Sequence, residues 1–274
     1  MVVKTLLKKW FAFLVITIAV LWTLLPLIDL VLMSFAGLGS LPTGLRLPKR
    51  LTMNNWRNVL FGDRIIWPFM LNSLIVGCYT SAITLIVAMP AAYSFSRHRS
   101  RLHNSVFRSM LILRIIPQVA LAIPIFFLLN TYRLLDTRIG LSFAHLIITI
   151  PLAVWLMKGY YDLLSTEIEE SAIIDGANWF QVLWRISIPL SAPGVAVTFM
   201  FCFLFSYIEY LYALIITRQS TFTLPIMFGT YMTHHETHWR LIACSSLISM
   251  IPMVILFGLL QKHLIRGFTL GAFK

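Results

Sequence analysis

Charged residues are scarce in this sequence of 274 residues: Asp, Glu, Lys and Arg together make up 12% of it, whereas hydrophobic residues make up 59%. A soluble domain carries roughly 25% charged residues, so about half of the usual polar surface is missing. The same composition excludes an intrinsically disordered chain, a coiled coil and a collagen-like chain. We therefore expect the surface of this protein to face lipid.

Acidic residues are scarcer than basic ones, with 10 Asp and Glu against 22 Lys and Arg and a net charge of +12. In a soluble chain such an excess would suggest a nucleic-acid partner. Here the basic residues lie largely between apolar runs, where they set the orientation of a membrane protein. We expect membrane lipid as a partner and no nucleic acid.

The sequence also lacks the spacings of a metal site, a disulfide framework or a nucleotide-binding loop. Its three cysteines each lie inside an apolar stretch, which is typical of small buried residues. Residues 234–238 read HHETH, with one residue between the Glu and the last His, and so depart from the H-E-x-x-H zinc spacing. No G-x-x-x-x-G-K-[ST] motif occurs. We expect no metal, no cofactor and no enzymatic activity in this chain.

Six apolar windows are long enough to cross a bilayer as helices, which needs roughly 20 residues each. The first follows three lysines, as in a signal peptide, but its apolar run is longer and no small-x-small cleavage site follows, so we expect it to be retained. We predict an all-α membrane protein with six transmembrane helices and a single domain over residues 1–274. The predicted spans are approximately 10–35, 68–95, 109–129, 139–157, 194–216 and 241–260.

Basic residues in the short connections predict the orientation of these spans. Three lysines precede the first span, four arginines crowd residues 96–108, and three Lys or Arg follow the last span. With six spans, all three segments lie on one side, which the positive-inside rule makes the cytoplasm. Both termini are therefore predicted to be cytoplasmic, together with the connection 158–193, whereas residues 234–238 lie outside.

The connection 158–193 has the pattern of folded structure. Residues 166–169 read T-E-I-E, a capping box in which Thr166 caps the helix and Glu169 reaches back. Gly176 then ends that helix, and a second amphipathic stretch stops at Pro189. The predicted helical hairpin has the same pattern as an ordinary interfacial hairpin. The apolar positions on one face of its first helix are Ile168, Ala172 and Ile173.

A longer motif runs through this connection. Residues 170–177 read ESAIIDGA, and nine residues separate Gly176 from Ile186, which begins the run I-S-I-P. The spacing resembles the EAA loop, E-A-A-x-x-x-G-x9-I-x-L-P, of permease subunits of binding-protein-dependent ABC importers. Ser171 replaces the second residue of the motif and Ile188 replaces its Leu.

The resemblance extends along nearly the whole chain. Residues 72–74 read N-S-L, residues 91–93 read A-A-Y with Arg97 following, and residues 114–117 read R-I-I-P. The C-terminal run 266–274, RGFTLGAFK, is similar to the R-G-x-T-x-G-A-x-K ending of the carbohydrate-uptake branch, which contains the second maltose-type permease.

This resemblance implies the fold of a type I ABC importer permease in the bacterial inner membrane. It implies a second homologous permease, a cytoplasmic ATPase dimer that binds ATP and Mg²⁺, and a periplasmic solute-binding protein as partners. The solute implied is a sugar or a sugar-like compound. The residues that match the ATPase-coupling loop are Glu170, Ser171, Ala172, Asp175, Gly176, Ala177, Ile186 and Pro189.

One departure concerns the fifth span, where that branch usually has W-N-E-F and residues 207–210 here read Y-I-E-Y. Glu209 lies within a predicted span, and charged groups at such depth usually face a cavity or a partner. It contacts either the solute or a base of the partner permease. Asp29 and Arg114, the other charges within predicted spans, lie near span ends. We assign to the substrate path Glu209, Tyr207, Tyr210 and Asn72.

Two other classes of function are weighed against the permease. An ion-coupled secondary transporter or channel subunit would show an internal repeat and several intramembrane ionisable groups. A membrane enzyme would show a spaced nucleophile or metal set. The EAA spacing favours the permease over both. The sequence does not name the solute: sugars, polyols, glycerol esters and sulfonated sugars all remain open.

Overall fold

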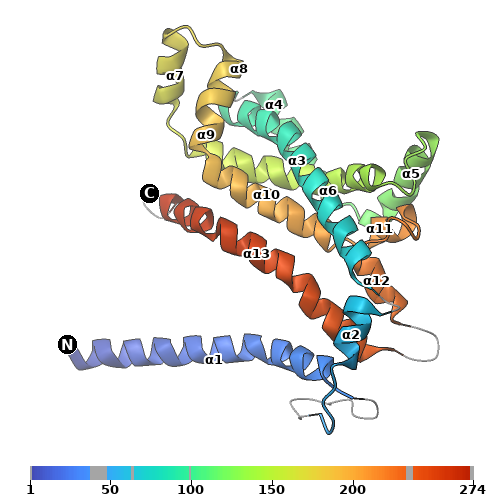
Figure 1. The fold of residues 1–274 in the computed structure, drawn as a ribbon. Coiled ribbons are helices and arrows are strands. Elements are labelled where there is room, and N and C mark those ends of the chain that lie inside the picture. Colours follow the sequence, from blue (N-terminus) through green and yellow to red (C-terminus); the bar gives the residue numbers. More distant parts are fainter. Residues whose placement is uncertain (1, 38–47, 63–64, 99, 233–236, 272–274) are drawn as a thin grey trace. The chain divides into compact units, whose positions relative to one another are not determined.

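A computed structural model describes residues 2–37, 48–62, 65–98, 100–232 and 237–271 (Figure 1). The prediction of an all-α protein is confirmed for these residues. Their helices, in chain order, are α1 (Val2–Ser34), α2 (Asn54–Phe61), α3 (Trp67–Arg97), α4 (Arg101–Leu113), α5 (Gln118–Thr131), α6 (Arg138–Asp162), α7 (Thr166–Ile174), α8 (Trp179–Val182), the π-helical turn η1 (Leu183–Ser187), α9 (Ile188–Leu190), α10 (Ala192–Tyr207), α11 (Leu211–Ile216), α12 (Leu224–Thr230) and α13 (Trp239–Gly271).

Four helical stretches are long and apolar enough to cross a membrane: Lys9–Ser34, Trp67–Arg97, Arg138–Asp162 and Trp239–Lys262. Two helix pairs pass the same test together but bend sharply. α4 and α5 meet at 98°, and residues 179–190 meet α10 at 80°. Among the described residues there are thus four spans, or six if each bent pair counts as one span.

The third and fifth predicted windows are interrupted. α4 ends at Leu113 and α5 begins only after Pro117, because proline disfavours the helical conformation in the residue before it. In the window 194–216, α10 ends at Tyr207 and α11 begins at Leu211. Hydropathy measures length and polarity but not continuity. Each of these two predicted windows is therefore helical but is formed by two helices with a break between them.

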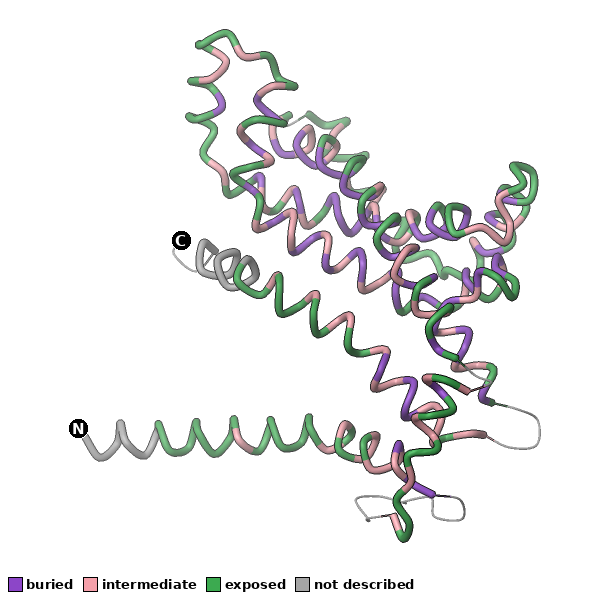
Figure 2. The backbone as a smooth tube through the Cα atoms, in the orientation of Figure 1, coloured by how far each residue is buried: buried purple, intermediate pink, exposed green. Residues whose placement is uncertain are grey.

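The chain divides into two compact units, and the first contains residues 1–67 and 228–251. Within it, the end of α1 is fixed by the carbonyl of Ser34, which accepts hydrogen bonds from Asn55 Nδ2 at 3.0 Å and from the Cys244 thiol at 3.4 Å. The apolar window of α1 is 0% buried (Figure 2). An apolar surface of this length is typical of a helix that faces lipid or another membrane helix.

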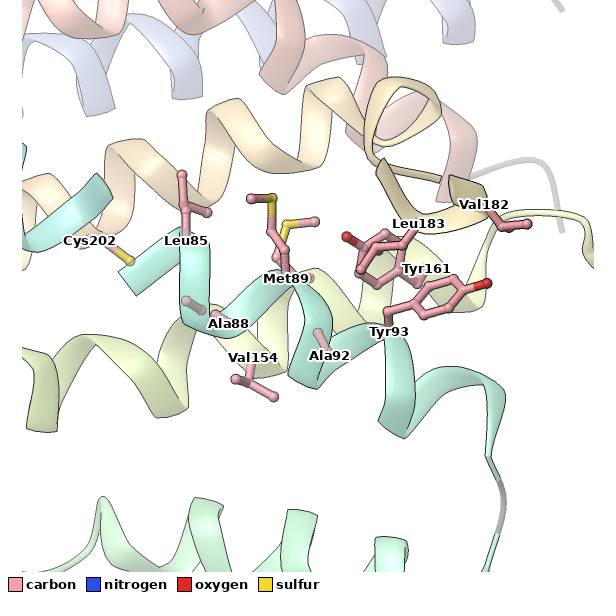
Figure 3. Packing of buried hydrophobic residues seen from close by; sticks show 12 residues of the cluster. Leu85, Ala88, Met89, Ala92, Tyr93, Val154, Tyr161, Val182, Leu183 and Cys202 are labelled. Carbon is pink, nitrogen blue, oxygen red and sulfur yellow. The ribbon is translucent and has the colours of Figure 1, made fainter. Parts of the chain in front are cut away.

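The second unit contains residues 68–227 and 252–274. Its core lies between α3, α6 and α10, where α10 packs along α6. The approach is close at Gly194, where a Cβ would lie 2.3 Å from the ring of Tyr160. Figure 3 shows Tyr93 and Tyr161 within this core, edge to face with ring centroids 5.6 Å apart. Other buried members are Ala88, Ala92, Ala153, Met157, Val182, Leu183 and Cys202.

Candidate functional site

The connection predicted to be folded forms a helical hairpin, residues 165–190, of α7, α8, η1 and α9 (Figure 1). α7 ends in a Schellman turn, in which Ala177 donates to the Ala172 carbonyl at 2.9 Å and Gly176 to the Ile173 carbonyl at 3.0 Å. Gly176 has φ of +92°, a conformation that favours glycine. The prediction that Gly176 ends this helix is confirmed.

The predicted capping box at the start of α7 is wrong. The N-cap is Ser165, whose hydroxyl accepts from the N–H of Glu167 at 3.3 Å. Glu169 is buried, with 3% exposure, and binds residues of other elements. A capping box occurs at α8 instead, where Asn178 and Gln181 exchange two hydrogen bonds of 2.9 Å.

Glu169 joins the hairpin to α3. Its Oε2 accepts from Arg97 Nε at 2.6 Å and from the Tyr93 hydroxyl at 3.0 Å. Its Oε1 accepts from Arg97 Nη2 at 2.9 Å and from the Ser187 hydroxyl at 2.7 Å. The Arg97 and Glu169 side chains are only 10% and 4% exposed. This is a bidentate ion pair shielded from water, with two further donors on the carboxylate.

Burial by itself would raise the pKa of Glu169. Hydrogen bonds from Arg97, Ser187 and Tyr93, together with the charge of Arg97, outweigh it and hold the pKa of this carboxyl below its ordinary value of 4.5. Glu169 is therefore ionised at neutral pH. Because each buried charge compensates the other, removing either one would leave its partner uncompensated.

The exposed outer face of the hairpin carries five of the predicted coupling residues. Large apolar side chains beside them are exposed: Ile174 is 86% exposed and Phe180 is 69% exposed. Such side chains next to acids are typical of a surface that a partner covers. Of the predicted coupling residues, the exposed ones are Glu170, Ser171, Asp175, Gly176 and Pro189, and the half-buried ones are Ala172, Ala177 and Ile186.

Asn72, predicted to line the substrate path, is 3% exposed near the start of α3. Its Nδ2 donates to the carbonyls of Ser220 at 3.1 Å and Phe222 at 2.9 Å, and its Oδ1 accepts from Arg138 Nε at 2.8 Å. Asp136 also binds the loop after α11, accepting from the Ser220 hydroxyl at 3.2 Å. In this structure the Asn72 amide holds that loop to the first turns of α3 and α6.

Glu209, the predicted acid of the fifth span, lies in the break between α10 and α11 and is 8% exposed. Its Oε2 lies 3.1 Å from His145 Nε2 on α6. The carboxylate also accepts from the backbone N–H of Tyr212 at 3.0 and 3.1 Å and from that of Ala213 at 3.2 Å. The structure thus provides a partner within the chain and a cap for the broken helix.

The other two path residues differ in exposure: Tyr207 is 5% exposed and Tyr210 is 45% exposed. A pocket of about 110 Å³ lies nearby, where the two interrupted windows meet. Its lining includes Arg114 from the break between α4 and α5, Gln118 at the start of α5, and Tyr212 from α11. The path assignments themselves stay predictions.

Among the described residues, no group of three or more His, Cys, Asp and Glu could hold a metal ion. The histidine cluster at 234–238 lies mostly outside the described residues, since 233–236 are not among them. His145 was not assigned a role from the sequence, and Glu169 was assigned only a role in capping α7. An acid within a predicted span needs a partner, and that signal could have pointed to His145 in the neighbouring apolar window.

The family model described as "Binding-protein-dependent transport system inner membrane component" matches residues 84–270. That range includes the whole hairpin and the interrupted fifth window. The chain belongs to this family. It is a permease subunit of an ABC importer, a multi-pass protein of the inner membrane, and the permease therefore belongs to a transport system rather than to a class of enzymes.

Relatives match the permease over most of its length. It is 31% identical over 259 residues to the "Trehalose/maltose transport system permease protein MalG" of Thermococcus litoralis, with 92% of this chain and 91% of the relative covered. It is 29% identical to the "Inner membrane ABC transporter permease protein YcjP" of Escherichia coli, with 92% and 91% covered. It is 25% identical to the "Trehalose transport system permease protein SugB" of Mycobacterium tuberculosis, with 94% and 95% covered.

A solved structure has the same fold. A chain of a bacterial ABC transporter involved in the import of the acidic polysaccharide alginate superposes with a TM-score of 0.74 at 23% identity, covering 93% of this chain and 96% of that one. A second alginate transporter structure, in complex with a pentasaccharide-bound periplasmic protein, gives a TM-score of 0.63 at 14% identity, with 94% of each chain covered. These matches support the fold of the permease.

Proposed function

We propose that the permease forms half of the translocation path for a sugar or sugar-like solute and that its hairpin couples this path to an ATPase dimer. The observation that carries the coupling role is the outer face of α7 and α8. Glu170 offers a negative charge there, and Ile174 and Phe180 offer apolar surface, 86% and 69% exposed. The Schellman turn at Gly176 keeps these groups in a fixed arrangement. A rigid surface of this kind is complementary to a groove with basic and apolar walls.

We infer that the hairpin lies on the cytoplasmic side. His98 and Trp179 have ring centroids 6.1 Å apart, so the arginine-rich connection after α3 lies at the same end of the second unit as the hairpin. Four arginines in a short connection favour the cytoplasm. Both termini then lie on that side as well, and the loops held by Asn72 and Asp136 lie on the periplasmic side.

Four kinds of partner complete the importer. A second homologous permease encloses the path, and membrane lipid surrounds both subunits. The ATPase dimer binds ATP and Mg²⁺, since the sequence contains no phosphate-binding loop. A periplasmic solute-binding protein delivers the cargo. ATP-driven closure of the dimer moves the hairpins, and the spans change between two access states.

The sugar class of the solute is supported by the names of relatives, which include trehalose, maltose and diacetylchitobiose transport proteins. Of the four proposed path residues, Tyr210 presents the most surface and is the one proposed to contact the solute. Asn72, Tyr207 and Glu209 shape the path around it. The pocket at Arg114 and Gln118 adjoins Tyr212, whose amide binds Glu209.

Co-purification tests the coupling role. The permease is tagged and expressed with its second permease and ATPase, and the ATPase recovered is quantified. Glu170→Lys reverses the charge at the docking face and should reduce recovery of the ATPase at least tenfold, because like charges repel across an interface. Tyr132→Lys introduces the same lysine side chain at the end of α5, where the tyrosine is 68% exposed, and should leave recovery unchanged. Equal recovery with both variants would reject the proposed docking face.

A further inference from the structure

We propose that Glu169 is a positioning residue that locks the hairpin to α3, so that α3 carries the movement of the hairpin to the opposite end of the second unit. This inference rests on the proposed coupling function. It concerns Glu169, which precedes the EAA-like segment, and not Glu170 within it.

The first step is the convergence of three elements, α3, α7 and η1, on one carboxylate. Both oxygens of Glu169 on α7 accept two hydrogen bonds each, from Arg97 and Tyr93 on α3 and from Ser187 on η1. Arg97 Nη1 also donates to the carbonyl of Tyr161 on α6 at 2.9 Å. With every donor directed at a fixed acceptor, α7 cannot rotate or slide on α3 without breaking several of these bonds.

The second step distinguishes the contact that orients the hairpin from the contacts that attach it to the bundle. Ala172 and Ile173 pack against the buried core of the second unit, and Val182 is part of that core. Apolar contacts of this kind hold the hairpin to the bundle but have no preferred direction. The charged, bidentate contact is the directional one. Neutralising Glu169 should therefore loosen the orientation of the hairpin while the apolar contacts keep it attached.

The third step is the attachment at the other end of α3. This helix has 31 residues and therefore spans about 45 Å. At its start, Asn72 Nδ2 donates to the carbonyls of Ser220 at 3.1 Å and Phe222 at 2.9 Å. Ser73 Oγ accepts from the N–H of Leu224 at 2.9 Å. α3 is thus fixed by polar bonds to the hairpin at one end and to the loop 220–224 at the other.

The experiment uses the assembled importer in proteoliposomes. Glu169→Gln keeps the size of the side chain and removes its charge, and Arg97→Lys keeps the charge but loses the two-pronged contact. Glu167→Gln, an exposed acid on the same helix, is the matched control. For each complex we would measure ATPase recovery, ATP hydrolysis stimulated by the loaded binding protein, and uptake of radiolabelled trehalose and maltose.

A second readout follows the lock directly. Spin labels on cysteines introduced at His98 and Thr166, both exposed, report the distance between the end of α3 and α7 with and without vanadate-trapped nucleotide. In the wild type this distance should be single and independent of nucleotide. In Glu169→Gln it should broaden by several ångströms with nucleotide bound, as it should to a smaller degree in Arg97→Lys.

We expect Glu169→Gln to retain the ATPase and its hydrolysis but to transport about tenfold less sugar per ATP, with Glu167→Gln unchanged. An unchanged transport ratio together with an unchanged label distance would overturn the positioning role. Loss of the ATPase from both Glu169→Gln and Arg97→Lys would also overturn it, because the pair would then serve folding or docking alone. If the wild-type chain recovers no ATPase, the proposed function itself fails.

Discussion

Gly176 turns the chain between α7 and α8 through a single backbone angle. An added Cβ there would meet no atom within 4 Å, so a side chain would be disfavoured only by the φ of +92°. The left-handed region costs other residues about 1–2 kcal/mol, and a β-branched side chain is the least tolerant of it. A substitution at Gly176 therefore tests the backbone conformation of the turn without a change in side-chain packing.

Gly176→Val should reduce ATP-driven uptake at least tenfold while the protein level in the membrane stays the same. The reason is that the turn must change its backbone angles, which redirects the docking face. Gly159→Val is the control, since a Cβ at Gly159 in α6 also meets nothing within 4 Å and no positive φ is required there. Uptake and immunoblots of membranes check both variants, and equal uptake would show that the turn needs no glycine.

Glu209 has its partners within this chain, so its removal should affect assembly before transport. Glu209→Ala leaves His145 and the N–H groups of Tyr212 and Ala213 without their acceptor, and each unsatisfied buried group costs about 1–3 kcal/mol. We expect the yield of the complex to fall several-fold. Tyr210→Ala, at a 45% exposed position, should preserve yield and lower uptake. Normal yield with lost uptake in Glu209→Ala would instead indicate a direct contact with the solute.

At the scale of elements, the attachment of the hairpin should depend on pH. Because the folded protein lowers the pKa of Glu169, the ionised form stabilises the hairpin above the ordinary value of 4.5, and this contribution is lost as the pH falls from 4.5 through the lowered pKa. The mobility of a spin label at Thr166 should therefore stay constant from pH 8 to about pH 5 and rise below pH 4.5. A rise already near pH 6 would contradict the assignment, as would the same profile in Glu169→Gln.

Elements governed by local chemistry were predictable from the sequence. The six apolar windows and the glycine turn depend on residues close together in the chain, and the structure has helices in each window. The role of Glu169 was missed because residues 166–169 have the spacing of a capping box, which predicts a local partner for Glu169. The structure has the capping box at 178–181 instead. Arg97 and Tyr93, which bind Glu169, lie 72 and 76 residues away. Local patterns carry no signal for such a partner.

The candidate site divides in the same way. The outer face of the hairpin follows from helical spacing, and Glu170 and Asp175 are exposed there. Ala172 and Ala177, also predicted coupling residues, pack against the core of the second unit instead. Asn72 and Glu209 were recognised as polar groups within predicted spans, but their contacts were not, because Ser220 lies 148 residues from Asn72 and His145 lies 64 residues from Glu209. The breaks in the two windows depend on Pro117 and on the carboxylate of Glu209, which caps α11. A hydropathy average over a window detects neither feature.

At the scale of the whole molecule, the account assigns the driving energy to ATP and not to an ion gradient. Glu209, the acid in the fifth window, is already bound by His145 and by two backbone N–H groups, and Asp29 lies near the end of its span. A carrier coupled to ions would need a group that is free to bind and release one. The exposed apolar side chains of the hairpin, in contrast, are typical of a surface that a partner subunit covers.

Uptake by the reconstituted importer tests this central claim most directly. Proteoliposomes containing the permease, its homologous partner and the ATPase dimer would receive the binding protein loaded with radiolabelled trehalose, maltose or diacetylchitobiose, with ATP on the ATPase side. The account predicts uptake of at least one sugar that requires both ATP and the binding protein and that persists when ionophores remove every ion gradient. Uptake driven by an ion gradient in the absence of ATP would contradict it.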